Sequence, residues 1–499
     1  MNRRSFVKVS GASFGSIMFA SSIAEFLTSC TKTTILNNTV GGTVQLAIVN
    51  ETSFLTPLNI PVTVGSNATL VPQSTTATIG GNSLQVLGYQ PNGILGPTIR
   101  INKGDSVNIK VQNNLSEPTN IHWHGLEIPV NMDGHPSNVI DPSGSFNYQY
   151  TVSQRASLSW YHPHPDGYTA SQVFKGIAGV FLINDSEETA LNLPSGENEI
   201  PIVIQDKRFS STGIVYSPSL MDNMNGYMGD KILVNGVISP FKEVSTRYYR
   251  LRILNGSNSR IYNLALSNNA DLIIIGNDGG LLKAPINVKS ILLAPGERLD
   301  VLVSFAGLTI GSEIFLQSNM FSSGGMMQGS QSFNILKFVV TKSVADTFSV
   351  PTKLSDITTI AESSAIKTRN FTITSMQMQS GMMGSSGGGH KINGKVYDKN
   401  RIDEYVTANT TEIWTFDNSQ GMEPHPMHIH ALHFQVLDRT GGRNQLIASE
   451  YGWKDTVLVM PGEKVRVIVP FSSLTGTYVF HCHNLEHEDN GMMLQFQVS

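Results

Sequence analysis

The sequence predicts an all-β protein built from three consecutive β-sandwich domains. Short runs of alternating apolar and polar residues dominate the 499-residue chain, and no long stretch follows the helical period. Turn-forming residues separate these runs, with 45 glycines and 22 prolines in the chain. The pattern also recurs roughly every 150 residues, a spacing that leaves room for one sandwich domain and its loops.

A repeated block marks each predicted domain. It begins with an Asn-Gly turn followed by an alternating apolar run, and it occurs at Asn92-Gly93, Asn235-Gly236 and Asn393-Gly394. A second block, Pro-Gly-Glu followed by alternating aliphatic residues, occurs at 295–297 and 461–463. We therefore expect domains at 45–187, 188–345 and 371–499, with a Ser/Thr-rich linker at 346–370.

The composition excludes several classes of protein. The chain has 34 Lys+Arg and 38 Asp+Glu, a net charge of −4, and no basic run, so we expect no nucleic-acid partner. No apolar run of about 18 residues follows the N-terminal segment, which excludes a protein that crosses the membrane several times. Two cysteines are too few for a disulfide framework. We expect a monomer.

Residues 1–30 have the pattern of an export signal. Arg3-Arg4-Ser5-Phe6 resembles the twin-arginine consensus, and a mildly apolar stretch of small residues follows it. Leu27-Thr28-Ser29-Cys30 resembles a lipobox, in which Cys30 carries the lipid. These resemblances predict export by the twin-arginine route to the periplasm and a lipid anchor on Cys30 at the membrane surface.

The histidines are concentrated in a few places. Ten of the 13 fall in four short clusters: His122/His124, His162/His164, His425/His428/His430 and His481/His483/His487. Side chains at positions i and i+2 of a strand point to one face, and the side chain at i+1 points to the other. His481 and His483 can therefore face one site while Cys482 faces a second site across the strand.

The residues on the Cys482 side form a coherent ligand set. His487 and Met492 follow within ten residues, and His425 comes from the same predicted domain. Two imidazoles, one thiolate and a weak thioether make up a blue-copper electron-transfer site. The other eight histidines are too many for one ion and suit a cluster of several copper ions. Four come from the first domain and four from the third, so we expect this cluster at their interface.

Taken together, the four clusters resemble the copper signatures of multicopper oxidases. These are His122-Trp123-His124-Gly125, His162-Pro163-His164, His425-Pro426-Met427-His428-Ile429-His430, and His481-Cys482-His483 through His487 to Met492. The resemblance implies three cupredoxin domains and four copper ions, one type 1, one type 2 and two type 3. It assigns type 1 to His425, Cys482, His487 and Met492, type 2 to His122 and His428, and the type 3 pair to His124, His162, His164, His430, His481 and His483.

The resemblance also implies a reaction. Members of the family take electrons singly at the type 1 copper and reduce dioxygen to water at the trinuclear cluster, with nearby carboxylates as proton donors. Asp133, in Met132-Asp133-Gly134, and Glu488 match the family's acidic residues by position. We therefore expect both to be catalytic.

Methionine clusters indicate the reductant. Ten of the 18 methionines fall in three segments: Met221/Met224/Met228, Met320/Met326/Met327 and Met376/Met378/Met382/Met383. Thioethers are soft ligands that select Cu(I). The third segment precedes the third domain, as the methionine-rich insert does in periplasmic copper-efflux oxidases, which residues 481–489 also resemble. We expect a cuprous oxidase in copper tolerance, with Met376, Met378, Met382 and Met383 as Cu(I) contacts.

Other functions stay open from the sequence. The methionine segment is short, which leaves space over His487 for phenols or aromatic amines and predicts a laccase-like oxidase. Oxidation of Fe(II) would require a cluster of carboxylates near His425 or His487, and Glu423 by itself gives this function little support. A copper-binding scaffold without turnover explains the methionines but requires neither the Cys482 bridge nor eight cluster histidines. A copper nitrite reductase requires no type 3 set.

Overall fold

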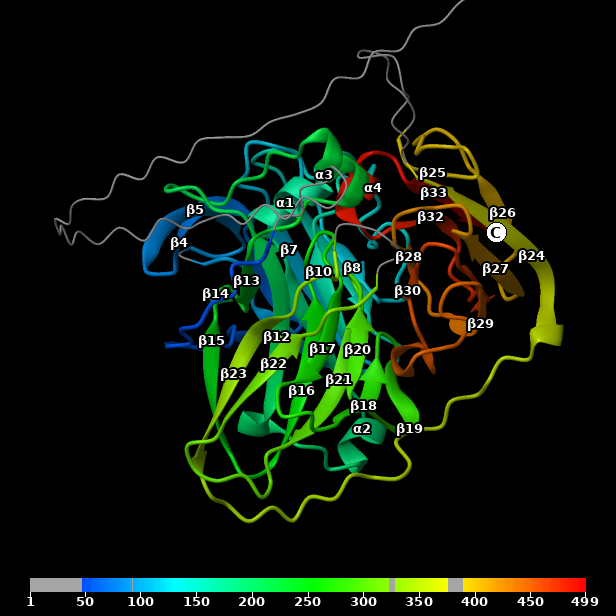
Figure 1. Cartoon of the computed structure of the whole chain (residues 1–499). Helices are drawn as coiled ribbons and strands as arrows, with labels where there is room; N and C mark the ends of the chain where they lie inside the picture. Colours follow the sequence, from blue (N-terminus) through cyan, green and yellow to red (C-terminus); the bar gives the residue numbers. More distant parts are fainter. Residues whose placement is uncertain (1–46, 92, 323–327, 376–388) are drawn as a thin grey trace, which may run out of the picture. The chain divides into compact units, whose positions relative to one another are not determined.

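The computed structural model describes residues 47–91, 93–322, 328–375 and 389–499, and strands dominate it (Figure 1). Its helices are short: α1 Thr169–Lys175, α2 Ser186–Ala190, α3 Leu220–Asn225 and α4 Leu485–Asp489, with 3-10 turns η1 Gly196–Asn198, η2 Glu362–Ser364 and η3 Ala448–Glu450. No helix within these ranges is long and apolar enough to cross a membrane. The strands form three β-sandwiches in chain order, as the sequence predicts.

The first sandwich packs the sheet β2-β6-β11-β10-β8 against the sheet β3-β7-β9. Its strands are β2 Thr63–Val64, β3 Asn67–Leu70, β6 Thr98–Asn102, β7 Ser106–Gln112, β8 His122–His124, β9 Ser145–Thr151, β10 Ser157–His162 and β11 Gly179–Asn184. In β7, Val107, Ile109 and Val111 are buried and alternate with exposed residues, as expected for a strand with one solvent face. The far face of β10 and β11 is buried as well, because Trp160 and Val180 pack on the second sandwich.

The second sandwich packs the sheet β14-β13-β12-β16-β21-β18-β19 against the sheet β1-β15-β23-β22-β17-β20. The strands of the first sheet are β12 Glu199–Lys207, β13 Lys231–Val234, β14 Val237–Ile238, β16 Tyr248–Asn255, β18 Leu272–Asn277, β19 Gly280–Val288 and β21 Arg298–Ser304. Those of the second are β1 Thr56–Pro57, β15 Pro240–Ser245, β17 Tyr262–Leu266, β20 Ser290–Leu293, β22 Glu313–Ser318 and β23 Phe333–Lys342. Asn235 and Gly236, both with positive φ, form the predicted two-residue turn between β13 and β14.

The N-terminal segment does not follow the expected division at residue 187. β1 pairs in parallel with β15, and Ile48 and Leu58 are buried in the core of the second sandwich. The hairpin β4 Gln73–Ile79 and β5 Asn82–Gly88 packs against Leu233 of β13. Residues 48–58 therefore reach the second sandwich before the chain enters the first. Local alternation in the sequence carries no information about this long-range pairing.

The third sandwich packs the sheet β25-β24-β27-β31-β29 against the sheet β26-β33-β32-β28-β30. Its strands are β24 Ala365–Thr374, β25 Lys391–Ile392, β26 Glu404–Val406, β27 Thr411–Asp417, β28 His425–Ile429, β29 Gln435–Thr440, β30 Thr456–Val459, β31 Lys464–Pro470, β32 Gly476–Cys482 and β33 Met493–Val498. β24 begins within the stretch expected to be linker, because it pairs in parallel with β27 over Ala365 to Thr372. Aromatic rings fill the core, with Phe480 in contact with Phe371, Trp414 and Phe496.

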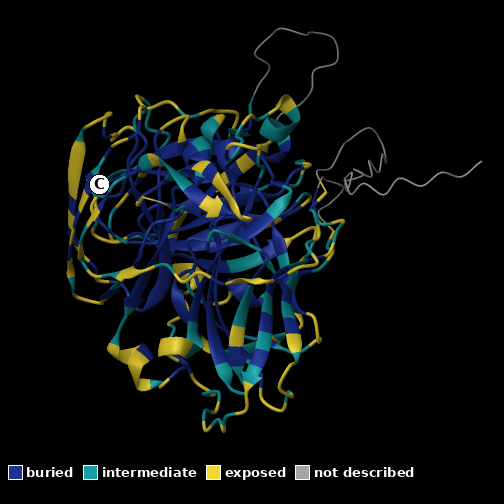
Figure 2. Ribbon diagram, turned by 90° about the vertical axis from the view of Figure 1, so that its left-hand side faces the viewer, coloured by how far each residue is buried: buried dark blue, intermediate teal, exposed yellow. Residues whose placement is uncertain are grey.

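Buried strand segments run through the interior of all three sandwiches, and the exposed residues lie mainly at loops and edges (Figure 2). Charged side chains are also buried where the second and third sandwiches meet. Arg298 contacts Asp455 and Asp278, while the Lys454 ammonium lies 2.8 Å from Asp278 and 3.0 Å from Glu297. These charges compensate one another, which a buried charge requires.

Replacing Phe480 by alanine should destabilise the third sandwich by about 3–5 kcal/mol, because the cavity left between three aromatic rings cannot close. Calorimetric unfolding of the copper-free protein measures the effect. The matched change Ile366→Ala, at a residue 66% exposed on β24, should cost less than about 0.5 kcal/mol. Equal unfolding temperatures for the two variants would contradict this account of the core.

Candidate metal centre

Eight histidines of the first and third sandwiches meet in one buried cluster. The Nε2 atoms of His122, in β8, and His428, in β28, lie 3.4 Å apart. β8 pairs with β10 so that His122 lies opposite His162, and β28 pairs with β32 so that His428 lies opposite His481. Each of the eight residues is at most 1% exposed. The cluster thus lies between the first and third sandwiches, where the sequence predicted it.

The ring nitrogens form groups of the size that one ion requires. His481 Nε2 lies 3.2 Å from His164 Nε2 and 3.1 Å from His430 Nε2. Metal–nitrogen bonds of about 2.0–2.1 Å in a tetrahedral site place two ligand nitrogens about 3.3 Å apart. The remaining three rings have centroids 4.9–5.9 Å apart and belong to His124, His162 and His483. The six residues expected at the type 3 pair therefore divide into two groups of three.

Hydrogen bonds outside the cluster fix how the rings present their nitrogens. His122 Nδ1 donates to the carbonyl oxygen of Asp133 at 2.8 Å, and His428 Nδ1 donates to that of Asp455 at 2.9 Å. Since a carbonyl only accepts, the protons lie on Nδ1 and the inward Nε2 atoms keep their lone pairs. His124 is reversed: its Nε2 lies 2.9 Å from Asp455 Oδ1, and its buried Nδ1 has no hydrogen-bond partner among the described residues.

Burial keeps six of the eight cluster imidazoles neutral. Desolvation is the largest effect and lowers the pKa of His428 to about 4. Desolvation and the nearby imidazoles also hold the pKa well below its usual value in His124, His162, His164, His430 and His483. Neutral imidazoles with inward lone pairs and no internal donor are what copper ions require as ligands. The donor set therefore fits the metal.

Cys482 faces a second site on the other side of β32. Its Sγ lies 3.4 Å from His425 Nδ1 and 3.6 Å from His487 Nδ1, and these two nitrogens are 3.3 Å apart. Met492 is fully buried in the same core, and its carbonyl oxygen accepts the Cys482 N–H at 3.1 Å. Burial raises the pKa of the Cys482 thiol, so a cation is required to stabilise the thiolate. The alternation predicted for His481, Cys482 and His483 is present.

The two predicted acidic residues both lie at the cluster. Asp133 Oδ2 is 2.8 Å from His430 Nδ1, and its Oδ1 is buried without a hydrogen-bond partner among the described residues. Glu488, in α4, places Oε2 3.1 Å from His481 Nδ1 and Oε1 3.4 Å from His164 Nδ1. Both carboxylates therefore lie beside the group formed by His164, His430 and His481.

Asp455 is a site residue that the sequence analysis missed. Its side chain contacts His124, its carbonyl oxygen accepts from His428, and Arg298 Nη1 donates to its Oδ1 at 2.7 Å. Burial alone would raise the pKa of this carboxyl group, but the Arg298 charge holds it well below its usual value. Asp455 thus remains charged and joins all three sandwiches at the cluster. No spacing in the sequence links residues 124, 298 and 455.

His390 is a second residue that was missed, since it lies outside the four clusters. Its ring stacks on that of His487 at a centroid distance of 3.7 Å. The Nε2–H of His390 donates to the carbonyl oxygen of Asn223, and that of His487 donates to the carbonyl oxygen of Met224 at 3.0 Å. Helix α3 of the second sandwich and His390 therefore cover the outer edge of His487.

His433 links the first and third sandwiches behind Asp455. Its Nδ1 lies 3.0 Å from Glu127 Oε1, and its Nε2 lies 3.8 Å from Asp455 Oδ2. Burial opposes a charge on this ring, but the hydrogen bond and charge of Glu127, with Asp455, outweigh it and raise the pKa of His433. The contact between His433 and Glu127 therefore joins the two sandwiches, and it is strongest when the imidazole carries its proton.

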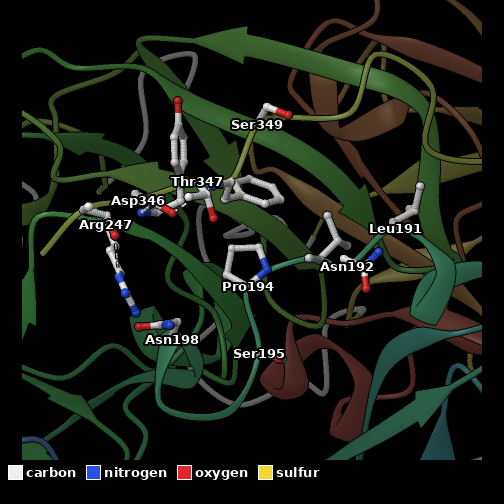
Figure 3. Close-up of a pocket in the computed structure, with 13 residues that line it drawn as sticks. Leu191, Asn192, Pro194, Ser195, Asn198, Arg247, Asp346, Thr347 and Ser349 are labelled. Carbon is white, nitrogen blue, oxygen red and sulfur yellow. Dashed lines mark hydrogen bonds between the residues drawn. The ribbon is translucent and has the colours of Figure 1, made fainter.

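Several predicted residues lie outside the described ranges: Met376, Met378, Met382, Met383 and Cys30. A surface pocket of about 500 Å³ also lies apart from the cluster, between residues 191–198 and 345–349 (Figure 3). Arg247 and Asp346 contribute its charges, and it contains none of the histidines or the cysteine described above.

Comparison with known proteins decides the family. Three family models, each described as multicopper oxidase, match residues 71–188, 159–312 and 365–499. The chain belongs to the multicopper oxidase family. It is an oxidoreductase with the cupredoxin-like fold expected from the resemblance, and its cofactor is copper.

Relatives with different names share this fold. The chain is 38% identical to the multicopper oxidase mco of Staphylococcus haemolyticus, over 84% of this chain and 85% of that protein. It is 33% identical to the laccase of Bacillus subtilis, over 82% and 89% of the two chains. The crystal structure of the multicopper oxidase McoA from Aquifex aeolicus matches with a TM-score of 0.80 and 36% identity, covering 90% of this chain and 100% of that one.

Replacing Cys482 by serine in this multicopper oxidase should remove one copper ion per chain and the visible colour of the copper–thiolate bond, since a hydroxyl is a poor substitute for a thiolate. Elemental analysis and absorption spectroscopy of the purified protein measure both. Cys30→Ser is the matched control and should leave both unchanged. An unaltered copper content and spectrum in Cys482→Ser would show that copper binds elsewhere.

Stability should depend on the proton of His433. Its pKa is higher in the folded than in the unfolded protein, so its stabilisation is complete below about pH 6.5 and is lost as pH rises through the folded pKa. His433→Gln should cost about 1 kcal/mol at pH 6 and progressively less as the pH rises through the folded pKa. Thermal unfolding of the copper-free protein tests this. The control His135→Gln removes a buried histidine whose pKa is lowered, and its stability should still fall above pH 6.5 as that of the wild type does. Parallel curves of stability against pH for the wild type and His433→Gln would disprove the prediction.

Proposed function

We propose that this multicopper oxidase couples four one-electron oxidations of Cu(I) to the four-electron reduction of dioxygen to water, and that it serves in copper tolerance. One observation carries the choice of substrate: His390, just after the methionine-rich segment, lies against the Cys482 site, and Ser375, just before the segment, lies beside Glu423. Before the segment, the Ser375 hydroxyl lies beside the Glu423 carboxyl group, two residues from His425. After it, His390 stacks on His487.

Four copper ions would occupy the two sites, one type 1, one type 2 and two type 3, and would supply electron transfer beside Cys482 and dioxygen reduction among the eight histidines. The chain supplies the ligands: His425, Cys482, His487 and Met492 at the first site, and His122, His428, His124, His162, His164, His430, His481 and His483 at the second. The backbone of β32 joins the two sites, because Cys482 is bonded directly to His481 and His483.

Reduction of dioxygen to two water molecules consumes four protons, and the two carboxylates at the cluster can supply them. Glu488 presents two buried oxygens, without hydrogen-bond partners among the described residues, beside His164 and His481. Asp133 likewise presents Oδ1, while Oδ2 orients His430. We assign both as proton donors.

The cover over His487 favours a small reductant. The carbonyl oxygen of Met224 accepts the His487 Nε2–H, and His390 covers the ring face, so a phenol cannot reach this imidazole edge without displacing α3. A single metal ion needs much less space. The methionines on α3 and in the segment that ends before His390 provide the soft ligands that Cu(I) prefers.

Replacing Met376, Met378, Met382 and Met383 together by serine should lower the rate of Cu(I) oxidation about tenfold, because the thioethers that collect Cu(I) are lost. Dioxygen consumption with chelated Cu(I) measures the rate. Gln377→Ser with Gln379→Ser changes the same segment without removing a thioether and should behave as wild type. Wild-type oxidation of a dimethoxyphenol should be slow until copper is added.

The main alternative is a laccase-like oxidase of phenols or aromatic amines, which the similarity to the Bacillus subtilis laccase supports. Equal Cu(I) rates in the methionine variant and the wild type, with rapid phenol oxidation in the absence of added copper, would favour it. No oxygen uptake with either reductant would leave a copper-binding scaffold.

We further propose that the protein acts in the periplasm after export by the twin-arginine route, anchored through Cys30. The support is the pattern of residues 1–30. Changing Arg3 and Arg4 to lysine should retain the protein in the cytoplasm, and Cys30→Ser should release it from the membrane fraction.

A further inference from the structure

A cavity of about 380 Å³ lies where the first and third sandwiches meet, and the chemistry assigned above makes no use of it. Domain-one residues 103, 127 and 153–157 line one side, and residues 432–433, 453 and 470–472 of the third sandwich line the other. Gly279 of the second sandwich completes the wall. Its volume falls within the range of small-molecule sites.

Three buried polar atoms at this cavity lack hydrogen-bond partners among the described residues: Gln154 Oε1, Ser157 Oγ and His433 Nε2. Their residues are 8%, 3% and 8% exposed. The Gln154 amide cannot turn freely, because its Nε2 donates to the carbonyl oxygen of Gly125 at 2.8 Å. Buried polar groups are normally satisfied, so we expect these atoms to take partners from the cavity, either water or a ligand that both donates and accepts hydrogen bonds.

The charges at the cavity favour an anion. Lys103, Arg155 and His433 are the basic residues, and Glu127 is the one acidic residue in the lining. Glu127 is already engaged with His433, and Arg155 contacts Glu187 at 3.1 Å. Within the described ranges Lys103 forms no ion pair, so its charge is available to a ligand. A carboxylate could accept from the Lys103 ammonium, the Ser157 hydroxyl and the His433 imidazole.

The rest of the lining is largely apolar. It includes Trp453, Phe471, Leu432 and Pro470. The Gly279 N–H donates to the Trp453 carbonyl oxygen at 2.9 Å, and a Cβ at residue 279 would lie 2.3 Å from Trp453 Cβ. This close approach holds the Trp453 backbone against the second sandwich. Aromatic side chains in a fixed wall stack well with a planar ring.

We propose that this cavity binds a small aromatic carboxylate. Its carboxylate group would contact Lys103, Ser157 and His433, its ring would lie against Trp453 and Phe471, and a ring hydroxyl could donate to Gln154 Oε1. The site is coupled to the histidine cluster, because His433 Nε2 lies 3.8 Å from Asp455, which in turn contacts His124. A ligand that accepts a hydrogen bond from this nitrogen alters the surroundings of Asp455.

Calorimetric titration of the copper-loaded full-length protein with benzoate tests the site. Benzoate should bind, and the neutral isostere benzamide should bind about tenfold more weakly because it lacks the charge. Lys103→Met should weaken benzoate about tenfold. Lys110→Met, at an exposed lysine of β7, is the matched control and should bind as wild type. No benzoate binding, equal binding of benzamide, or equal weakening by both lysine variants would overturn the proposal.

A second measurement tests the coupling. Saturating benzoate should shift the electron paramagnetic resonance spectrum of the wild-type copper-loaded protein. His433→Gln should bind benzoate more weakly and, once saturated, show no shift. A spectrum unchanged by bound benzoate in the wild type would overturn the coupling between the cavity and the cluster.

Discussion

The cluster of eight histidines depends on one buried carboxylate. Asp455 contacts His124 of the first sandwich, Arg298 of the second and His428 of the third. The first and third sandwiches have separate cores, so they can present their histidines to common ions only if their edges are held at fixed distances. A fully buried, charged group that bonds to all three provides this constraint. Its removal would leave the buried Arg298 to share Asp278 with Lys454, which is strongly destabilising.

The clustered histidines and Cys482 could be identified from the sequence because the spacing that marks them is local. His-x-His pairs and the Cys482 position follow strand alternation, which depends on neighbouring residues alone. Asp455, Arg298 and His390 could not be found this way, because their roles arise from contacts between residues far apart in the chain. The pairing of β1 with β15 was missed for the same reason: two residues of strand carry no alternation, and their partner lies in another domain.

Forming the histidine cluster without metal lowers the stability of the folded protein. Its inward nitrogens have been removed from water and several have no partner among the described residues, including His162 Nε2 and both ring nitrogens of His483. Unsatisfied buried polar atoms destabilise a fold. Ions that bind these atoms in the folded protein alone stabilise it by mass action, so copper content and thermal stability should rise together.

The N-terminal segment has a consequence for synthesis. Ile48 exchanges hydrogen bonds with Gln331, which lies 283 positions later in the chain. Strand β1 can pair only after its partner β15 has been synthesised. The ribosome therefore releases a first sandwich whose leading segment has no docking surface until the second sandwich has emerged. Domains usually fold in the order in which they are synthesised. Here residues 48–58 are synthesised before the second sandwich but can dock on it only after it has formed.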